Sequence, residues 1–196
     1  RSLISFAEQH QEELASSPDE GLASLVKDAA FDMGEQVEQR VPQADAHTTC
    51  VVAWVSLPER RLTTLHVGDS RIYRFDNSSI HWRSRDHSVV QMLLDQGEIT
   101  EQEMGHHPAQ SLLTRSISTN EEIRPSVKLH DAPLQENEVV LLCSDGFWEE
   151  VTPDEICSLA GTKEVKKQHL QDLVQLAGKR AKGESDNITA QLLWFA

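Results

Sequence analysis

Residues 62–75 read LTTLHVGDSRIYRF. Two runs rich in β-branched and apolar residues, 62–67 and 71–75, flank the pair Gly68-Asp69, which is typical of a tight turn between strands. Because strands joined by a short turn pair antiparallel, this segment predicts part of an antiparallel sheet. It also puts the carboxylate of Asp69 at the end of a strand, where rigid backbone can hold it in place.

The rest of the chain extends this pattern with short strands and amphipathic helices. Further strands are expected over 48–55, 80–83, 127–129, 138–143 and 188–195. Helices are expected over 3–14, 18–37, 87–96, 100–104, 153–161 and 170–181. Helix pairs beside runs of antiparallel strands predict an α+β fold, a layered sandwich. A dinucleotide-binding fold is disfavoured, since the sequence has neither βαβ alternation nor a GxGxxG turn.

Composition limits the classes of partner. The 196 residues include 18 Lys and Arg against 32 Asp and Glu, a net charge of −14, which argues against nucleic acid. No apolar run approaches the roughly 20 residues that span a bilayer. The three cysteines form no zinc pattern and are typical of reduced core thiols. We therefore expect a cytoplasmic monomer without nucleic-acid or membrane partners.

Three aspartates, Asp69, Asp145 and Asp186, each stand in a turn at the end of an apolar strand. Carboxylate oxygens are the ligands that Mg²⁺ and Mn²⁺ prefer. Any one of these turns, taken alone, is more often a plain turn than a metal site. Their order along the chain, together with the segments between them, makes the pattern specific.

These segments resemble motifs of the PPM (type 2C) family of metal-dependent protein serine/threonine phosphatases, and in particular its bacterial members. The matching segments, in family order, are 47–49 (HTT), 68–71 (GDSR), 85–88 (RDHS), 96–100 (QGEIT), 113–115 (LTR), 144–148 (SDGFW) and 186–189 (DNIT). The resemblance runs from about Thr48 to the C-terminus. It implies an α-β-β-α sandwich, two antiparallel sheets between helix pairs.

The resemblance also implies a reaction, the hydrolysis of phosphoserine and phosphothreonine in signalling proteins by a water that two Mn²⁺ or Mg²⁺ ions activate. It makes Asp145 and Asp186 metal ligands and adds no further catalytic side chain. In some members a third ion binds at the positions of Asp69 and Glu149. The family commonly has Asp where this chain has Glu149, which is a departure at that third site.

The family's N-terminal metal motifs, an acidic residue on an Arg-containing strand and a DGxGG turn, do not occur in this sequence, which starts at Arg1. We therefore expect residues 1–196 to be a single PPM-type domain that lacks its N-terminal strands and is catalytically incomplete alone. Two alternatives stay open. One is a non-catalytic, protein-binding PPM-like module. The other is a regulatory phosphatase of the sporulation and stress-response branch, which the GDSR, DHS and DNIT segments disfavour.

The segment from His87 to Arg115 corresponds in the resemblance to a flap beside the metal site that helps to select substrates. Its few apolar anchors predict mobility around 104–110. Arg71 is not assigned to phosphate, because it can pair with an acidic group. Trp148, beside the SDG turn, is expected to be a core residue.

Overall fold

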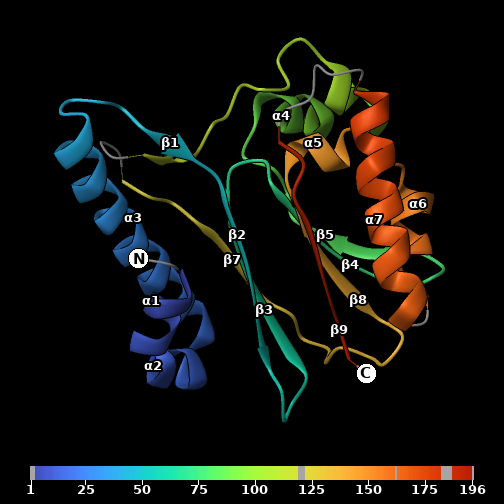
Figure 1. Ribbon diagram of the computed structural model, residues 1–196, viewed down its shortest axis with the longest axis horizontal. Coiled ribbons are helices and arrows are strands. Elements are labelled where there is room, and N and C mark those ends of the chain that lie inside the picture. The colour runs from blue at the N-terminus through green and yellow to red at the C-terminus, as the bar shows by residue number, and fades with distance from the viewer. Residues whose placement is uncertain (1–2, 119–121, 162, 182–186, 196) are drawn as a thin grey trace. The chain divides into compact units, whose positions relative to one another are not determined.

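The structure is a computed structural model that describes residues 3–118, 122–161, 163–181 and 187–195. The chain divides into two compact units. Unit 1 comprises residues 1–68 and 115–133, and unit 2 comprises residues 69–114 and 134–196. Each unit has its own antiparallel sheet and its own helices (Figure 1).

Unit 1 is a helical layer packed beside a small sheet. Its elements are α1 (Leu3–Gln9), α2 (Gln11–Ser16), α3 (Pro18–Arg40), β1 (His47–Thr48), β2 (Cys50–Ser56), β3 (Arg61–Val67), β6 (Ile117–Ser118) and β7 (Ser126–Leu129). The main sheet has the order β2-β3-β7, and β1 pairs separately with β6. Helix α3 packs on β3 and β7. The core between them is apolar and includes Phe6, Leu14, Leu22, Val26, Leu65 and Val67.

The helix predicted over residues 3–14 is broken at His10, which separates α1 from α2. The imidazole lies between two carboxylates, with Nδ1 3.1 Å from Glu13 and Nε2 2.9 Å from Asp28 of α3. The hydrogen bonds to Asp28 and then to Glu13 raise the pKa of His10. Helix α3 begins at Pro18, as predicted, although the hydroxyl of Ser17 makes no capping hydrogen bond.

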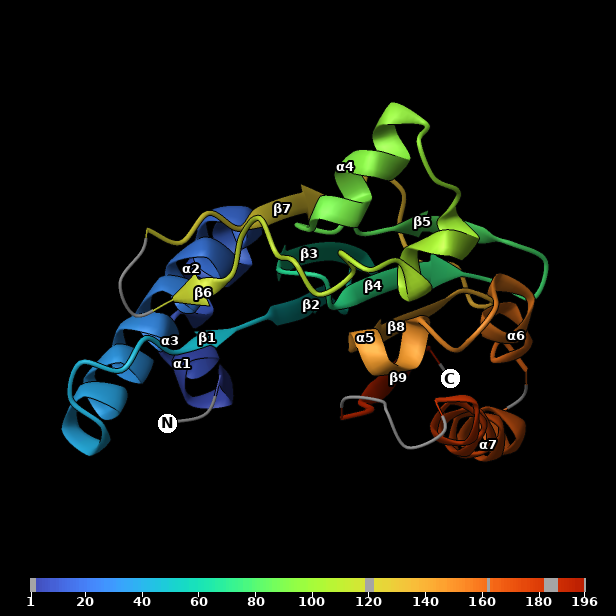
Figure 2. The ribbon, with the colours of Figure 1, turned by 90° about the horizontal axis from the view of Figure 1, so that it is seen from above.

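Unit 2 is a four-stranded sheet with helices packed around it. Its elements are β4 (Arg71–Phe75), β5 (Ile80–Arg83), α4 (Val89–Gln96), the 3-10 helix η1 (Glu101–His106), β8 (Val139–Cys143), α5 (Asp145–Trp148), α6 (Pro153–Ser158), α7 (Lys163–Arg180) and β9 (Ala190–Trp194). The sheet order is β5-β4-β8-β9, antiparallel throughout. Figure 2 shows α6 and α7 along one side of this sheet. The core includes Phe75, Leu141, Phe147, Ile156, Leu159 and Ala177.

The expected α+β class, with antiparallel sheets and helices, is confirmed. The strands predicted over 71–75 and 80–83 have the bounds of β4 and β5. Capping boxes open η1 at Thr100 and α6 at Thr152, where the sequence predicted helix starts. Within the described residues, none of the helices combines the length and the apolar character needed to cross a membrane.

Candidate metal centre

Asp145 lies at the end of a strand, as predicted, because β8 stops just before Ser144 and α5 begins at Asp145. The Ser144 hydroxyl donates a hydrogen bond to the carbonyl of Asn187 and accepts one from the Thr189 N–H, both at 3.0 Å. One side chain therefore ties the turn before α5 to the segment that enters β9. Asp186 lies outside the described residues, so its convergence with Asp145 stays a prediction.

Helix α5 sets two of the predicted carboxylates one turn apart. The Oδ1 atom of Asp145 accepts a hydrogen bond from the Gly146 N–H at 2.8 Å. The Glu149 N–H donates to the Asp145 carbonyl at 3.0 Å, and residues four apart share one helix face. Among the described residues, the Oε1 atom of Glu149 is buried without a hydrogen-bond partner. A buried, unpaired carboxylate oxygen is costly unless something positive compensates it.

Asp69 brings a third carboxylate to this neighbourhood. It follows β3, is 6% exposed, and its backbone carbonyl accepts a hydrogen bond from Trp148 Nε1 at 2.9 Å. Burial raises the pKa of Asp69 to about 6, and the Asp145 carboxylate adds to the rise. Burial, followed by the charges of Asp145 and Asp69, raises the pKa of Glu149 to about 7. The three carboxylates are therefore close enough to repel one another.

This arrangement fits a hard divalent cation. Its donors are all carboxylate oxygens, as Mg²⁺ and Mn²⁺ prefer, and a cation would offset both the mutual repulsion and the unpaired oxygen of Glu149. In the part of the chain that the structure describes, no group of three or more His, Cys, Asp or Glu side chains is arranged to hold a metal ion. The described carboxylates therefore do not form a metal site by themselves, and metal binding by Asp69, Asp145, Glu149 and Asp186 stays a prediction.

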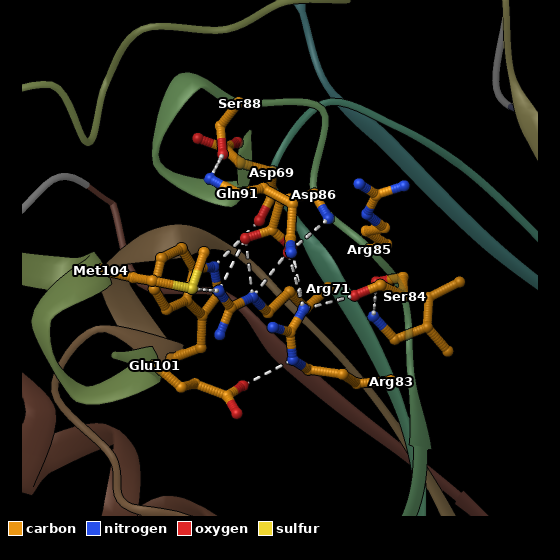
Figure 3. A network of polar contacts seen from close by, with 12 residues as sticks. Asp69, Arg71, Arg83, Ser84, Arg85, Asp86, Ser88, Gln91, Glu101 and Met104 are labelled. Carbon is orange, nitrogen blue, oxygen red and sulfur yellow. Dashed lines mark hydrogen bonds and ion pairs between the residues drawn. The ribbon is translucent and has the colours of Figure 1, made fainter. Parts of the chain in front are cut away.

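Arg71 and Trp148 have the surroundings that the sequence predicted. Arg71 is buried and pairs with Asp86 (Figure 3). Its Nε atom lies 2.9 Å from Oδ1 and 3.0 Å from Oδ2 of Asp86, and its Nη2 atom lies 2.6 Å from Oδ2. Its expected pairing with an acidic group is therefore confirmed. Trp148 is 7% exposed and belongs to the core of unit 2, as predicted.

The sequence predicted Val90, Leu94 and Ile99 as apolar anchors of the segment 87–115, and they pack in or against the core of unit 2, but it missed one further anchor. The prediction of few apolar anchors is wrong at Met104, which is fully buried in the core of unit 2. Gly105 packs so closely on Glu149 that an added Cβ would lie 3.0 Å from the Glu149 Cα and Cβ atoms. The capping box at Thr100 was a signal for ordered structure here, because it opens η1.

Comparison with known proteins agrees with these observations. The sequence profile of the family described as protein phosphatase 2C matches residues 1–192. The serine/threonine protein phosphatase PstP of Mycobacterium tuberculosis is 32% identical over 154 residues, which are 79% of this chain and 28% of the relative. The protein phosphatase PhpP of Streptococcus pneumoniae is 32% identical over 128 residues, 65% of this chain and 50% of the relative.

The chain thus spans half or less of the length of these two curated relatives. Among solved structures, the crystal structure of the Mycobacterium tuberculosis serine/threonine phosphatase PstP/Ppp superposes with a TM-score of 0.79 at 26% identity. The superposition covers 97% of this chain and 77% of that one.

Proposed function

Because the chain belongs to the protein phosphatase 2C family, we propose that it hydrolyses phosphoserine and phosphothreonine in proteins with the help of two Mn²⁺ or Mg²⁺ ions. The relatives' names support the reaction. The structural observation that carries the proposal is the crowding of Asp69, Asp145 and Glu149, with one buried Glu149 oxygen left unpaired among the described residues.

In this proposal Asp145 and Asp186 hold the two ions, while Asp69 and Glu149 contribute to a third. When bound, such ions supply Lewis acidity, which makes water nucleophilic at neutral pH and offsets phosphoryl charge. The chain's own contribution is placement. Helix α5 fixes the spacing of Asp145 and Glu149, and the Trp148 indole holds the backbone at Asp69. Fixed carboxylates need little reorganisation on binding, which favours catalysis.

We further propose that the protein is a monomer that acts on phosphorylated signalling proteins in the cytoplasm. The three cysteines, Cys50, Cys143 and Cys157, are all free thiols, which supports a reducing compartment. Size-exclusion chromatography with light scattering tests the oligomeric state.

The test replaces Asp145 by Asn, which keeps the shape of the side chain and removes its charge. Mn²⁺ binding is measured by calorimetry on residues 1–196 and on the complete gene product, and phosphopeptide hydrolysis on the latter. We expect Asp145→Asn to lower kcat/KM by about 100-fold or more, because the ligand is needed for metal-assisted attack. The control is Asp131→Asn, since Asp131 is exposed in unit 1.

Activity that survives both Asp145→Asn and EDTA would refute the proposal. A complete gene product that binds Mn²⁺ and phosphopeptide without turnover would instead favour the protein-binding module. The comparison of residues 1–196 with the complete gene product also tests whether the chain is catalytically incomplete alone.

A further inference from the structure

Arg71 of β4 occupies the centre of a buried polar network in unit 2. Its side chain is 3% exposed, and the side chain of its partner Asp86 is fully buried. Besides the Asp86 carboxylate, the guanidinium donates to the Tyr73 hydroxyl at 3.1 Å and to the Met104 sulfur at 3.5 Å. Figure 3 shows Asp86 and Met104 directed toward the same guanidinium. Strand β4, the segment before α4, and η1 therefore meet at this one group.

The network also reaches the candidate metal centre. The Arg71 guanidinium carbon lies 3.4 Å from the centroid of the Trp148 ring, a cation–π contact. The indole N–H of Trp148 in turn donates to the backbone carbonyl of Asp69 at 2.9 Å. Two direct contacts therefore connect Arg71 to the backbone of Asp69 through Trp148.

A second arm runs through η1 to Glu149. Met104, which touches Arg71, is followed by Gly105, whose backbone packs on the Glu149 side chain. Arg83 braces the same segment, because its Nε donates to Glu101 at 2.5 Å and its Nη1 donates to Gln91 at 3.1 Å. Arg71 therefore contacts η1 at Met104, and Arg83 contacts it at Glu101.

Stability alone is a weak reason for such a pair. A buried ion pair often contributes no more than apolar residues of the same volume would, because both charges lose their hydration. Arginine offers what an apolar residue or a lysine cannot, a rigid plane that binds a carboxylate with two nitrogens and stacks on an aromatic ring at the same time. The guanidinium of Arg71 does both.

We infer that Arg71 is a positioning residue, through which one guanidinium orients Asp69 and seats η1 against Glu149. Resting on the proposed function, the inference extends to specificity. A phosphoprotein would contact both the carboxylates and the flap, the segment 87–115, whose relative positions depend on Arg71. A small aryl phosphate would depend on the carboxylates alone. Loosening Arg71 therefore affects the two substrates unequally.

The test uses Arg71→Lys, which keeps the positive charge and removes the planar, two-nitrogen contact. Arg74→Lys is the matched control. Arg74 is on the same strand, its side chain is 9% exposed, and it binds Glu138 with Nε at 3.0 Å and Nη2 at 2.7 Å. The readout is backbone hydrogen exchange of metal-free residues 1–196, over 69–71 and 101–107.

We expect Arg71→Lys to speed exchange over 101–107 by about tenfold or more, because local opening becomes easier, while Arg74→Lys leaves that segment unchanged. Equal acceleration in both variants, or none in either, overturns the inference. If Arg71→Lys does not fold, Trp148→Phe is tested instead, since Phe keeps an aromatic ring beside Arg71 and removes the indole N–H that binds Asp69. Faster exchange over 69–71 in Trp148→Phe supports the inference, and unchanged exchange there overturns it.

Activity of the complete gene product gives a second readout. Arg71→Lys should raise the KM for a phosphopeptide about tenfold relative to that for an aryl phosphate, while Arg74→Lys leaves the ratio unchanged. An unchanged ratio in Arg71→Lys overturns the specificity part of the inference. Because hydrogen exchange needs neither metal nor turnover, an inactive protein that shows the expected exchange pattern refutes the proposed function and leaves Arg71 as a positioning residue.

Discussion

Replacing Glu149 by Gln should stabilise the metal-free protein. Burial and the neighbouring carboxylates raise the pKa of Glu149 from its ordinary 4.5 to about 7. A carboxyl group with a raised folded-state pKa begins to destabilise the fold as pH passes the unfolded pKa, and its cost is complete above the folded pKa. At about 1.4 kcal/mol for each pKa unit, the cost of this rise is at most about 3.5 kcal/mol. Because Glu149 is only partly buried, we expect about 1–2 kcal/mol.

The assay is urea denaturation of residues 1–196 in EDTA, at about pH 8 and about pH 5. Glu149→Gln should exceed the wild type in free energy of unfolding at the higher pH, and the difference should shrink at the lower one. Glu150→Gln, which removes the adjacent carboxylate, is the control and should change little. A Glu149→Gln variant that is no more stable than the wild type at about pH 8 would refute the reasoning. Added Mn²⁺ should stabilise the wild type more than the variant, if Glu149 is a ligand.

Three further predictions concern local structure. Gly68 has φ +100°, and an added Cβ would lie 2.4 Å from Thr49 Cγ2, so Gly68→Ala should cost about 1–3 kcal/mol of stability; an unchanged thermal midpoint would contradict this. His10→Gln should lower the free energy of unfolding by less than about 1 kcal/mol, and only at low pH. The reason is that a histidine with a raised pKa stabilises the fold below the ordinary value of 6.5, and this stabilisation is lost as pH rises through the folded-state pKa. A deficit that persists at high pH would count against it. Thr152→Ala removes half of a capping box and should cost about 1 kcal/mol in urea denaturation, while an equally stable variant would show that the box is dispensable.

Local signals in the sequence predicted most of the elements. The short apolar runs of β4 and β5, the helix starts at Thr100 and Thr152, and the Pro at the start of α3 all depend on a few neighbouring residues, and the structure confirms these elements. The break at His10 was missed, and at this break the imidazole contacts Asp28, a residue of another helix. Local periodicity carries no information about such a partner.

In the candidate site, too, motifs identified individual residues, whereas contacts between distant residues were missed. Asp69, Asp145 and Glu149 were identified by motif, and their mutual repulsion raises the pKa of Asp69 and of Glu149. The joint role of Asp86 and Met104 could not be read from sequence, because they are separated by 18 positions and meet only at the Arg71 guanidinium. A buried arginine whose contacts come from three segments is a property of the packing.

The division into two units has a consequence for how the chain folds as it is made. The chain passes between the units three times, after residues 68, 114 and 133. In unit 2, Arg71 pairs across the sheet with Cys143, and Cys143 pairs with Ala190. At the usual rate of protein synthesis, strand β4 therefore waits on the order of ten seconds before β8 exists. Such distant pairings slow folding. Until β8 is made, Arg74 has no Glu138 to bind, and the edge of β4 that pairs with β8 stays open, as an unprotected strand edge that can pair with another chain.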